Sequence, residues 1–133
     1  MIATAAQAQT TQPRTRFMAI DVNIDPQGQS LAAYQVDFRA LSGDVKLVGV
    51  EGGAPGVFAA APYYDAKALR QSRVIIAAFS TDTALPTTKT RVARLHVQIA
   101  GDTTPDYQIK LIVAGNRDSK PIDATATFEP YQK

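Results

Sequence analysis

The chain has 133 residues, of which 45% are hydrophobic and 20% charged, proportions that suit one globular domain. Fourteen Lys and Arg nearly balance twelve Asp and Glu, and they are scattered along the chain. We therefore expect that the chain does not bind a nucleic acid, because proteins bind a phosphate backbone through clustered positive charge. The absence of cysteine excludes disulfides, thiolate nucleophiles and Cys-ligated metal sites. We also expect no membrane span, because no apolar stretch approaches the roughly 20 residues that one needs.

Residues 1–16 differ from the rest of the chain. They have no hydrophobic periodicity, and they contain small-residue triplets such as Ala6-Gln7-Ala8, which are typical of the segment before a signal-peptidase cut. Two interpretations stay open: the remnant of an export signal, and a flexible linker tail. We favour export, and so predict a secreted or cell-envelope protein, extracellular or periplasmic, whose folded domain is residues 17–130.

Two strands are predicted at the start of this domain. Apolar and polar residues alternate from Phe17 to Asp25, the period expected of a half-buried strand. Residues 26–29 (PQGQ) form a turn. Residues 31–39 then continue the alternation, with Tyr34 on the dry face. The outward residues of this second strand are Gln35, Asp37 and Arg39.

The middle of the chain is less regular. A third strand is expected over residues 45–50, followed by a glycine-rich loop at 52–56. Residues 65–70 (DAKALR) predict one or two helical turns capped by Asp65. The unbroken apolar run in residues 73–80 predicts a strand that is covered on both faces or lies centrally in its sheet.

Three further strands are predicted at 91–100, 107–113 and 122–128. In the first of them Ala93, Leu95, Val97 and Ile99 should point inward, and Arg94, His96 and Gln98 outward. Each strand has one hydrophobic face, and packing two antiparallel sheets buries all of these faces. The sequence therefore predicts an all-β fold, a two-sheet β-sandwich or jelly roll of seven to nine strands, with at most one short helix.

Catalytic chemistry has little support in the sequence. His96 is the only histidine, and no serine lies in a Gly-x-Ser-x-Gly elbow. We expect His96 to be a surface imidazole, and an enzymatic role would require a carboxylate or hydroxyl beside it. Carboxylate pairs exist, but a small sandwich leaves little chain to build a glycosidase cleft. The chain is therefore predicted not to be an enzyme.

Calcium is the ion that the sequence suits best, since loop oxygens suffice to bind it. Asp21, Asn23 and Asp25 alternate along one strand, and Asn116 and Asp118 lie in a later turn. Solvated acids at strand edges explain the same residues, so the metal stays undecided and no cofactor is assigned.

Exposed aromatic side chains are the usual platform for carbohydrate. Tyr34 and Tyr107 fall in phase with core residues, which leaves Tyr63 and Tyr64 as the candidates for such a platform. Loop anchors packed on the edge of the sandwich would explain both tyrosines equally well.

Several local strings resemble those of the cohesin-type domain, a bacterial extracellular jelly-roll module. They are AIDVNID, SLAAYQVDF, KLVGVEGG, SRVIIAAFSTD and RVARLHVQIAG, and they cover roughly Phe17 to Phe128. The chain has Ala40-Leu41-Ser42 where such domains commonly carry a Tyr-Asp-Pro corner. The resemblance implies a nine-stranded jelly roll and a protein partner of the dockerin type, which such domains hold on a sheet face.

The first hypothesis is therefore a non-catalytic binding module for extracellular protein assembly or adhesion. The alternative is a carbohydrate-binding module of a polysaccharide-degrading system, with a polysaccharide as its ligand. The residues predicted to contact the partner are Gln35, Asp37, Arg39, Tyr63, Tyr64, Arg94, His96 and Gln98.

Overall fold

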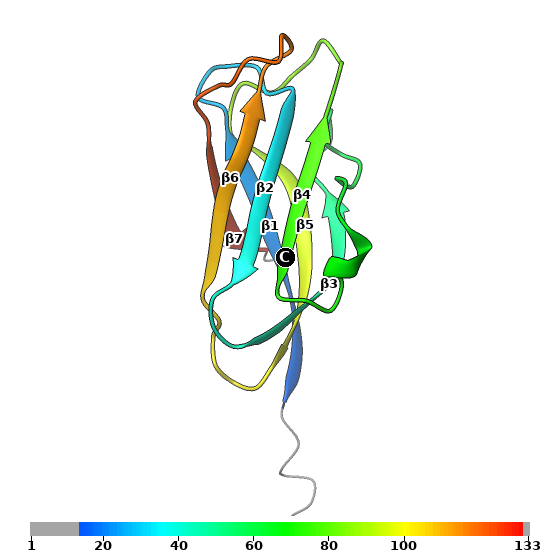
Figure 1. Ribbon diagram of the computed structural model, residues 1–133, viewed down its shortest axis with the longest axis vertical. Helices are drawn as coiled ribbons and strands as arrows, with labels where there is room; N and C mark the ends of the chain where they lie inside the picture. Colours follow the sequence, from blue (N-terminus) through cyan, green and yellow to red (C-terminus); the bar gives the residue numbers. More distant parts are fainter. Residues whose placement is uncertain (1–13, 132–133) are drawn as a thin grey trace, which may run out of the picture.

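The chain folds into two antiparallel sheets packed face to face, as seen in a computed structural model that describes residues 14–131 (Figure 1). The seven strands are β1 (Thr15–Asp25), β2 (Ala33–Ala40), β3 (Asp44–Gly52), β4 (Arg73–Phe79), β5 (Thr90–Ala100), β6 (Tyr107–Gly115) and β7 (Thr125–Pro130). One sheet has the order β3-β5-β1-β7 and the other β4-β2-β6. The predicted all-β sandwich is confirmed, with a strand count at the low end of the expected range.

Alternation of apolar and polar residues produces this arrangement, because successive side chains of a strand point to opposite faces. In β5 the inward residues Leu95, Val97 and Ile99 are at most 1% exposed, as predicted. The inner faces of both sheets supply the core: Ile20, Val22, Ile24, Tyr34, Val36, Phe38, Val45, Leu47, Val74, Ile76, Val92, Ala93, Leu95, Val97 and Ile99.

Aromatic packing closes the sandwich on the side of β6 and β7. The rings of Phe38 and Tyr107 stack at 5.2 Å between centroids, and Phe128 meets both rings edge-on at 5.7 and 5.9 Å. Such contacts add to the area that these rings bury. They join β2 and β6 of one sheet to β7 of the other.

Strand β4 lies at an edge of its sheet, and the prediction of a central or doubly covered strand is wrong. Its run of apolar residues nevertheless alternates in exposure, with Val74 and Ile76 buried and Ile75 and Phe79 exposed. Tyr63 forms an isolated antiparallel bridge with Ala77 on the outer side of β4 through two backbone hydrogen bonds of 2.8 and 3.0 Å. The bridge covers the strand at one point only.

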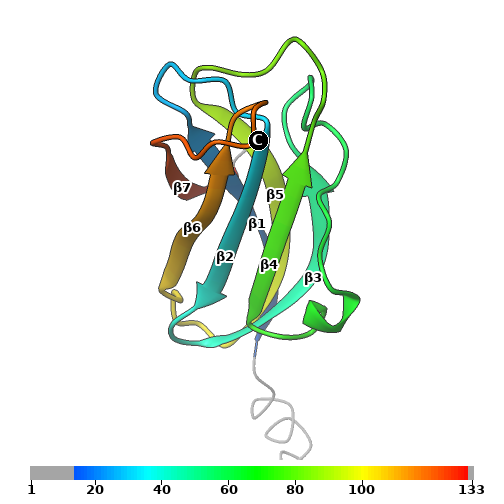
Figure 2. The same cartoon turned by 45° about the horizontal axis from the view of Figure 1, so that its top comes forward.

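The predicted helix is one turn of 3₁₀ helix, η1 (Ala66–Ala68), on the β4 side of the molecule (Figures 1 and 2). Asp65 is its N-cap as expected, and its carboxylate accepts a hydrogen bond from the Lys67 amide at 2.9 Å. Within residues 14–131, no helix has the length and apolar character that crossing a membrane requires.

Strand β1 begins at Thr15, two residues before the predicted start of the folded domain. The remainder of the predicted tail, residues 1–13, lies outside the described residues, and so does any export signal that it contains.

Candidate binding surface

The outer face of the three-stranded sheet, called here the three-stranded face, collects exposed hydrophobic side chains. This face looks toward the viewer in Figure 1, where β6, β2 and β4 form the front layer. Within the described residues, large exposed hydrophobic side chains on this sheet and its Tyr63 bridge are Tyr63, Ile75, Phe79, Ile112 and Val113. A contiguous apolar surface of this kind marks an interaction site more reliably than single exposed residues do.

Strand register arranges the outward side chains of this face in rows. Tyr63, Ala77, Gln35 and Val113 form one row across the sheet, and Phe79 with Ala33 forms the row beside it. On the other side of the first row come Ile75, Asp37 and Lys110, and then Arg73, Arg39 and Gln108. Ile112 occupies a bulge in β6. The face is therefore apolar at one end and basic at the other.

The apolar end is built around two aromatic rings. Tyr63 and Phe79 are 71% and 66% exposed, and their rings stack with centroids 6.4 Å apart and planes 14° apart. Tyr64, by contrast, is half-buried and packs against the core. Of the two adjacent tyrosines predicted for a platform, Tyr63 is thus exposed at the surface and Tyr64 is not. Neighbouring tyrosines in an extended segment point to opposite sides, and Tyr63 finds its partner in Phe79.

The basic end contains a buried carboxylate. Asp37 points outward as the alternation predicts, yet it is only 4% exposed because two guanidinium groups cover it. Arg73 binds both carboxylate oxygens, Nε to Oδ1 at 3.0 Å and Nη2 to Oδ2 at 2.7 Å, and Arg39 Nη2 reaches Oδ2 at 2.8 Å. The hydrogen bonds from Arg73, above all, hold the pKa of Asp37 below its ordinary value. Asp37 is therefore not a free polar contact on the surface.

The remaining predicted residues lie on the opposite face of the molecule, the outer face of the four-stranded sheet. Arg94 Nε donates to Asp21 Oδ1 at 2.7 Å, and its guanidinium carbon lies 3.5 Å from the centre of the Tyr131 ring. His96 Nε2 contacts Glu51, and Gln98 is half-buried. Seven of the eight predicted residues thus divide between two faces while Tyr64 packs against the core, and one partner surface cannot include them all.

His96 is outward and partly exposed, as predicted, and it has the neighbouring carboxylate that an enzymatic role would require. Its cross-strand neighbours are Ala19 on β1 and Gly49 on β3, which carry neither a nucleophile nor a proton donor. The His96–Glu51 pair alone provides no catalytic constellation.

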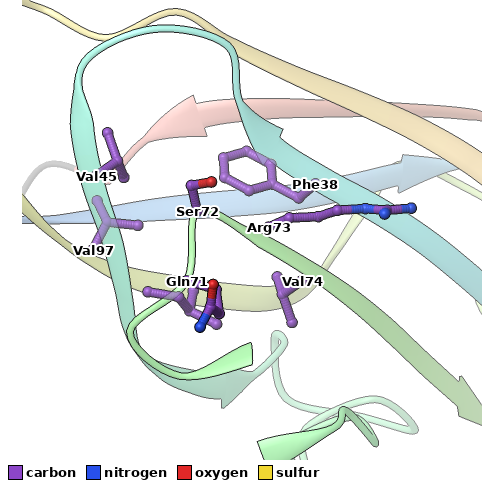
Figure 3. A pocket seen from close by; sticks show the side chains of 8 residues that line it. Phe38, Val45, Gln71, Ser72, Arg73, Val74 and Val97 are labelled. Atoms are coloured by element: carbon purple, nitrogen blue, oxygen red, sulfur yellow. The ribbon is translucent and has the colours of Figure 1, made fainter. Parts of the chain in front are cut away.

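The pocket between the two sheets is too small for an organic ligand. Figure 3 shows a pocket where residues 71–74 pass between the two sheets; its volume is about 10 Å³, and it is lined mainly by apolar side chains. One water molecule needs about that much space. A larger, open hollow lies between the loops around Ser30, Thr83 and Arg117, where Arg117 Nη2 is hydrogen-bonded to the carbonyls of Asp82 and Thr83. Surfaces are therefore the stronger candidates for binding.

Four of the five side chains proposed for calcium have other hydrogen-bond partners. Asp21 binds Arg94, Asp25 accepts a hydrogen bond from the Gln27 amide, and Asn116 accepts from two amides of its own turn. Asn23 is buried and donates to Glu129 at 3.2 Å. No group of three or more acidic or histidine side chains in residues 14–131 is placed to hold a metal ion.

The strand order and the two packed sheets give the chain a cohesin-type fold, as the sequence strings predicted. It is similar to a chain of the solved structure described as the crystal structure of the CaDoc0917(R16D)-CaCohA2 complex at pH 5.5, a cohesin bound to a dockerin. The TM-score is 0.64 at 11% sequence identity, over 81% of this chain and 82% of that chain. No family model and no curated protein sequence matches the chain significantly. At this identity the likeness establishes the fold.

Proposed function

We propose that this chain is a non-catalytic module that binds a partner protein through the three-stranded face, in an extracellular or cell-envelope assembly. The observation that carries the proposal is the exposed apolar surface of that face: Tyr63, Phe79 and Val113 at its apolar end, and Ile75 in the adjacent row, are between 37% and 71% exposed. Exposed aromatic and aliphatic side chains on a rigid sheet are the usual anchors of a protein interface.

The face is also preorganised for binding. Its central strand, β2, is paired with β4 on one side and β6 on the other, so the backbone that carries the outward side chains is fixed before a partner arrives. A rigid surface loses little conformational entropy on association. This favours the three-stranded face over the loops at the ends of the sandwich.

The four-stranded face is a weaker candidate. Four of its charged or titratable side chains already bind one another, Arg94 with Asp21 and His96 with Glu51. A partner would have to compete with these contacts. Phe17 is 68% exposed on β1, where its cross-strand neighbour is the polar Gln98.

The solved structure with the same fold holds its chain in a complex with another protein, which supports a protein partner here. More specifically, we propose that the partner protein is of the dockerin type. Polysaccharide remains the competing ligand, and the exposed Tyr63–Phe79 pair is where it would bind.

The test is partner capture from the extracellular and envelope fraction of the source organism, with and without a calcium chelator, beside a panel of polysaccharides. The captured protein is then purified, and its affinity is measured by calorimetry. We expect Ile75→Ala combined with Phe79→Ala to weaken binding about tenfold or more, because truncating central anchors typically costs over 1 kcal/mol. Phe17→Ala, on the other face, is the matched control and should leave the affinity unchanged.

Equal affinities for the wild type and the double variant would show that the three-stranded face is not the interface. Retention on a polysaccharide with no protein captured, abolished by Tyr63→Ala, would replace the proposal with a carbohydrate-binding module.

A further inference from the structure

The loops at one end of the sandwich form a surface that is separate from the outer faces of both sheets. We propose that this loop end is a second binding site, and that its ligand is a short, uncharged saccharide. The inference goes beyond the proposed function, because it gives the chain another ligand at another place.

Three loops meet at this end, residues 26–32 after β1, 80–89 after β4 and 116–121 after β6 (Figure 2). Two open hollows lie between them, with volumes of about 550 and 350 Å³. Asn116 and Arg117 line both hollows, so the two are neighbours that share a wall. Pockets for small organic ligands usually measure about 300–1,000 Å³. Each hollow therefore has the size of a small-molecule site.

Each hollow combines polar groups with an apolar surface. In the larger one, the amide of Gln29 and the hydroxyls of Ser30 and Thr83 lie around Leu85. The smaller one has hydroxyl side chains around the exposed ring of Phe79, and these are Ser80, Thr81 and Ser119. A sugar ring has C–H groups on its faces and hydroxyl groups at its rim, so an apolar ring beside amides and hydroxyls is complementary to it.

The wall between the hollows is fixed by hydrogen bonds before any ligand arrives. Arg117 Nη2 donates to the carbonyl oxygens of Asp82 and Thr83 at 3.0 and 3.3 Å, which connects the third loop to the second. A guanidinium group has five N–H donors, so others are left for a ligand. Asn116 Oδ1 accepts from the amides of Asp118 and Lys120 at 2.9 and 3.0 Å, which fixes the direction of its donor end, Nδ2.

The first loop is also held in place. The Gly28 amide donates to the Thr87 carbonyl at 2.9 Å, and the Leu31 amide donates to the Pro86 carbonyl at 3.0 Å. All three loops are thus connected by hydrogen bonds between residues distant in the sequence. A preformed site loses little conformational entropy when it binds a small ligand.

The charges at the loop end favour an uncharged ligand. Arg117 contacts the backbone of Asp82, and its neighbour Asp118 lines the larger hollow with it. With Lys120 in the same turn, two positive charges balance two negative charges. An anion would find no excess of positive charge, and residues 14–131 place no group of three acidic or histidine side chains that could hold a metal ion. The complementary ligand is therefore rich in hydroxyl groups and carries no charge.

The test is a titration of the isotope-labelled complete chain, followed by the amide chemical shifts in NMR spectra. The probes are glucose, cellobiose, maltose, xylobiose and chitobiose, with sodium phosphate as the anionic probe. We expect at least one of the sugars to shift the amides of residues 29–31, 81–84 and 116–120, with a Kd of about 1 mM, as is usual for so small a ligand. Phosphate should leave these amides unchanged.

Variants locate the site. Arg117→Ala should weaken sugar binding about tenfold, because it removes hydrogen bonds from a charged donor. Gln29→Ala, at an exposed position, should weaken it about threefold without loosening the loops. Arg14→Ala is the matched control and should have no effect. Arg14 lies at the opposite end of the sandwich, where it is exposed and 3.8 Å from Asp102.

Several results would overturn the saccharide site. They are amide shifts at the loop end with phosphate instead of sugars, no shifts with any of the sugars, and sugar binding that Arg117→Ala and Gln29→Ala leave unchanged. Sugar binding that is lost in Tyr63→Ala and retained in Arg117→Ala would also overturn it, by placing the sugar on the three-stranded face.

The saccharide site and the proposed protein interface can fail separately. Arg117→Ala should still capture the partner protein, and Ile75→Ala should still bind the sugar. Phe79 borders both surfaces, so it is not used to distinguish them.

Discussion

Replacing Gly53 by alanine is expected to destabilise the sandwich by about 3 kcal/mol or more, at the upper end of what overpacking costs. A Cβ atom at this position would lie 2.1 Å from the carbonyl oxygen of Arg91 and 2.8 Å from two backbone atoms of Val92. These are backbone atoms at the start of β5, which cannot turn aside as a flexible side chain would. The amide groups of Gly53 and Ala54 donate to Phe58 and Arg91, so the segment is held in place on both sides.

The measurement is equilibrium denaturation in urea, which gives the free energy of unfolding. Gly49→Ala is the matched control, because its Cβ would lie at an ordinary 3.8 Å from His96 Cβ. Glycine within a strand costs about 0.5–1 kcal/mol relative to alanine, so this control should be as stable as the wild type or slightly more so. A Gly53→Ala protein with wild-type stability would show that the loop and β5 are not in such close contact.

Replacing Asp37 by asparagine is expected to lower the free energy of unfolding at neutral pH by about 2 kcal/mol, the contribution of hydrogen bonds between charged groups. Arg73 and Arg39 lose their shared carboxylate, and both are exposed enough for water to replace part of the contact. The loss is therefore smaller than for a fully buried ion pair.

The pH dependence of stability gives this prediction its sharpest test. Because the folded state lowers the pKa of Asp37, its contribution is complete above the unfolded pKa of about 3.9 and is lost as the pH falls through the lower folded value. The stabilities of the wild type and of Asp37→Asn should therefore converge below about pH 4. Asp44→Asn, at an exposed position at the start of β3, is the control. A gap between wild type and Asp37→Asn that stays constant with pH would show that the carboxylate is not held by the arginines.

Most of the fold could be predicted because the alternation of apolar and polar residues within a strand indicates which of its side chains are buried. The alternation in β5, with Leu95 and Val97 inward and Arg94 and His96 outward, holds residue by residue from Ala93 to Ile99. The edge position of β4 could not be predicted in this way. The sequence of an apolar strand is the same whether its outer face is covered by protein or exposed at the surface. The apolar residues Ile75 and Phe79 therefore gave no sign that they are exposed.

The candidate surface was harder to predict because it depends on contacts between strands distant in the sequence. Alternation correctly pointed Asp37 outward, but Arg73, which helps to cover it, is 36 residues away. Likewise, Gln35 and His96 both point outward from sheets whose outer faces lie on opposite sides of the molecule. Tyr63 was predicted as an exposed aromatic candidate, and the phase of Phe79 with the outward Ile75 is the further signal in the sequence that could have identified the apolar end.

The bridge between Tyr63 and Ala77 has a consequence for the behaviour of the protein at high concentration. β4 is an edge strand whose exposed side is rich in apolar residues, a combination that invites another chain to add a strand and start an aggregate. Tyr63 occupies both backbone groups of Ala77, near the middle of the strand, and so interrupts the edge that an incoming strand would need. The Tyr63 bridge thus hinders strand addition at the edge of β4 and, with it, fibril growth. The exposed apolar side chains on the outer face of the sheet stay accessible to the proposed partner.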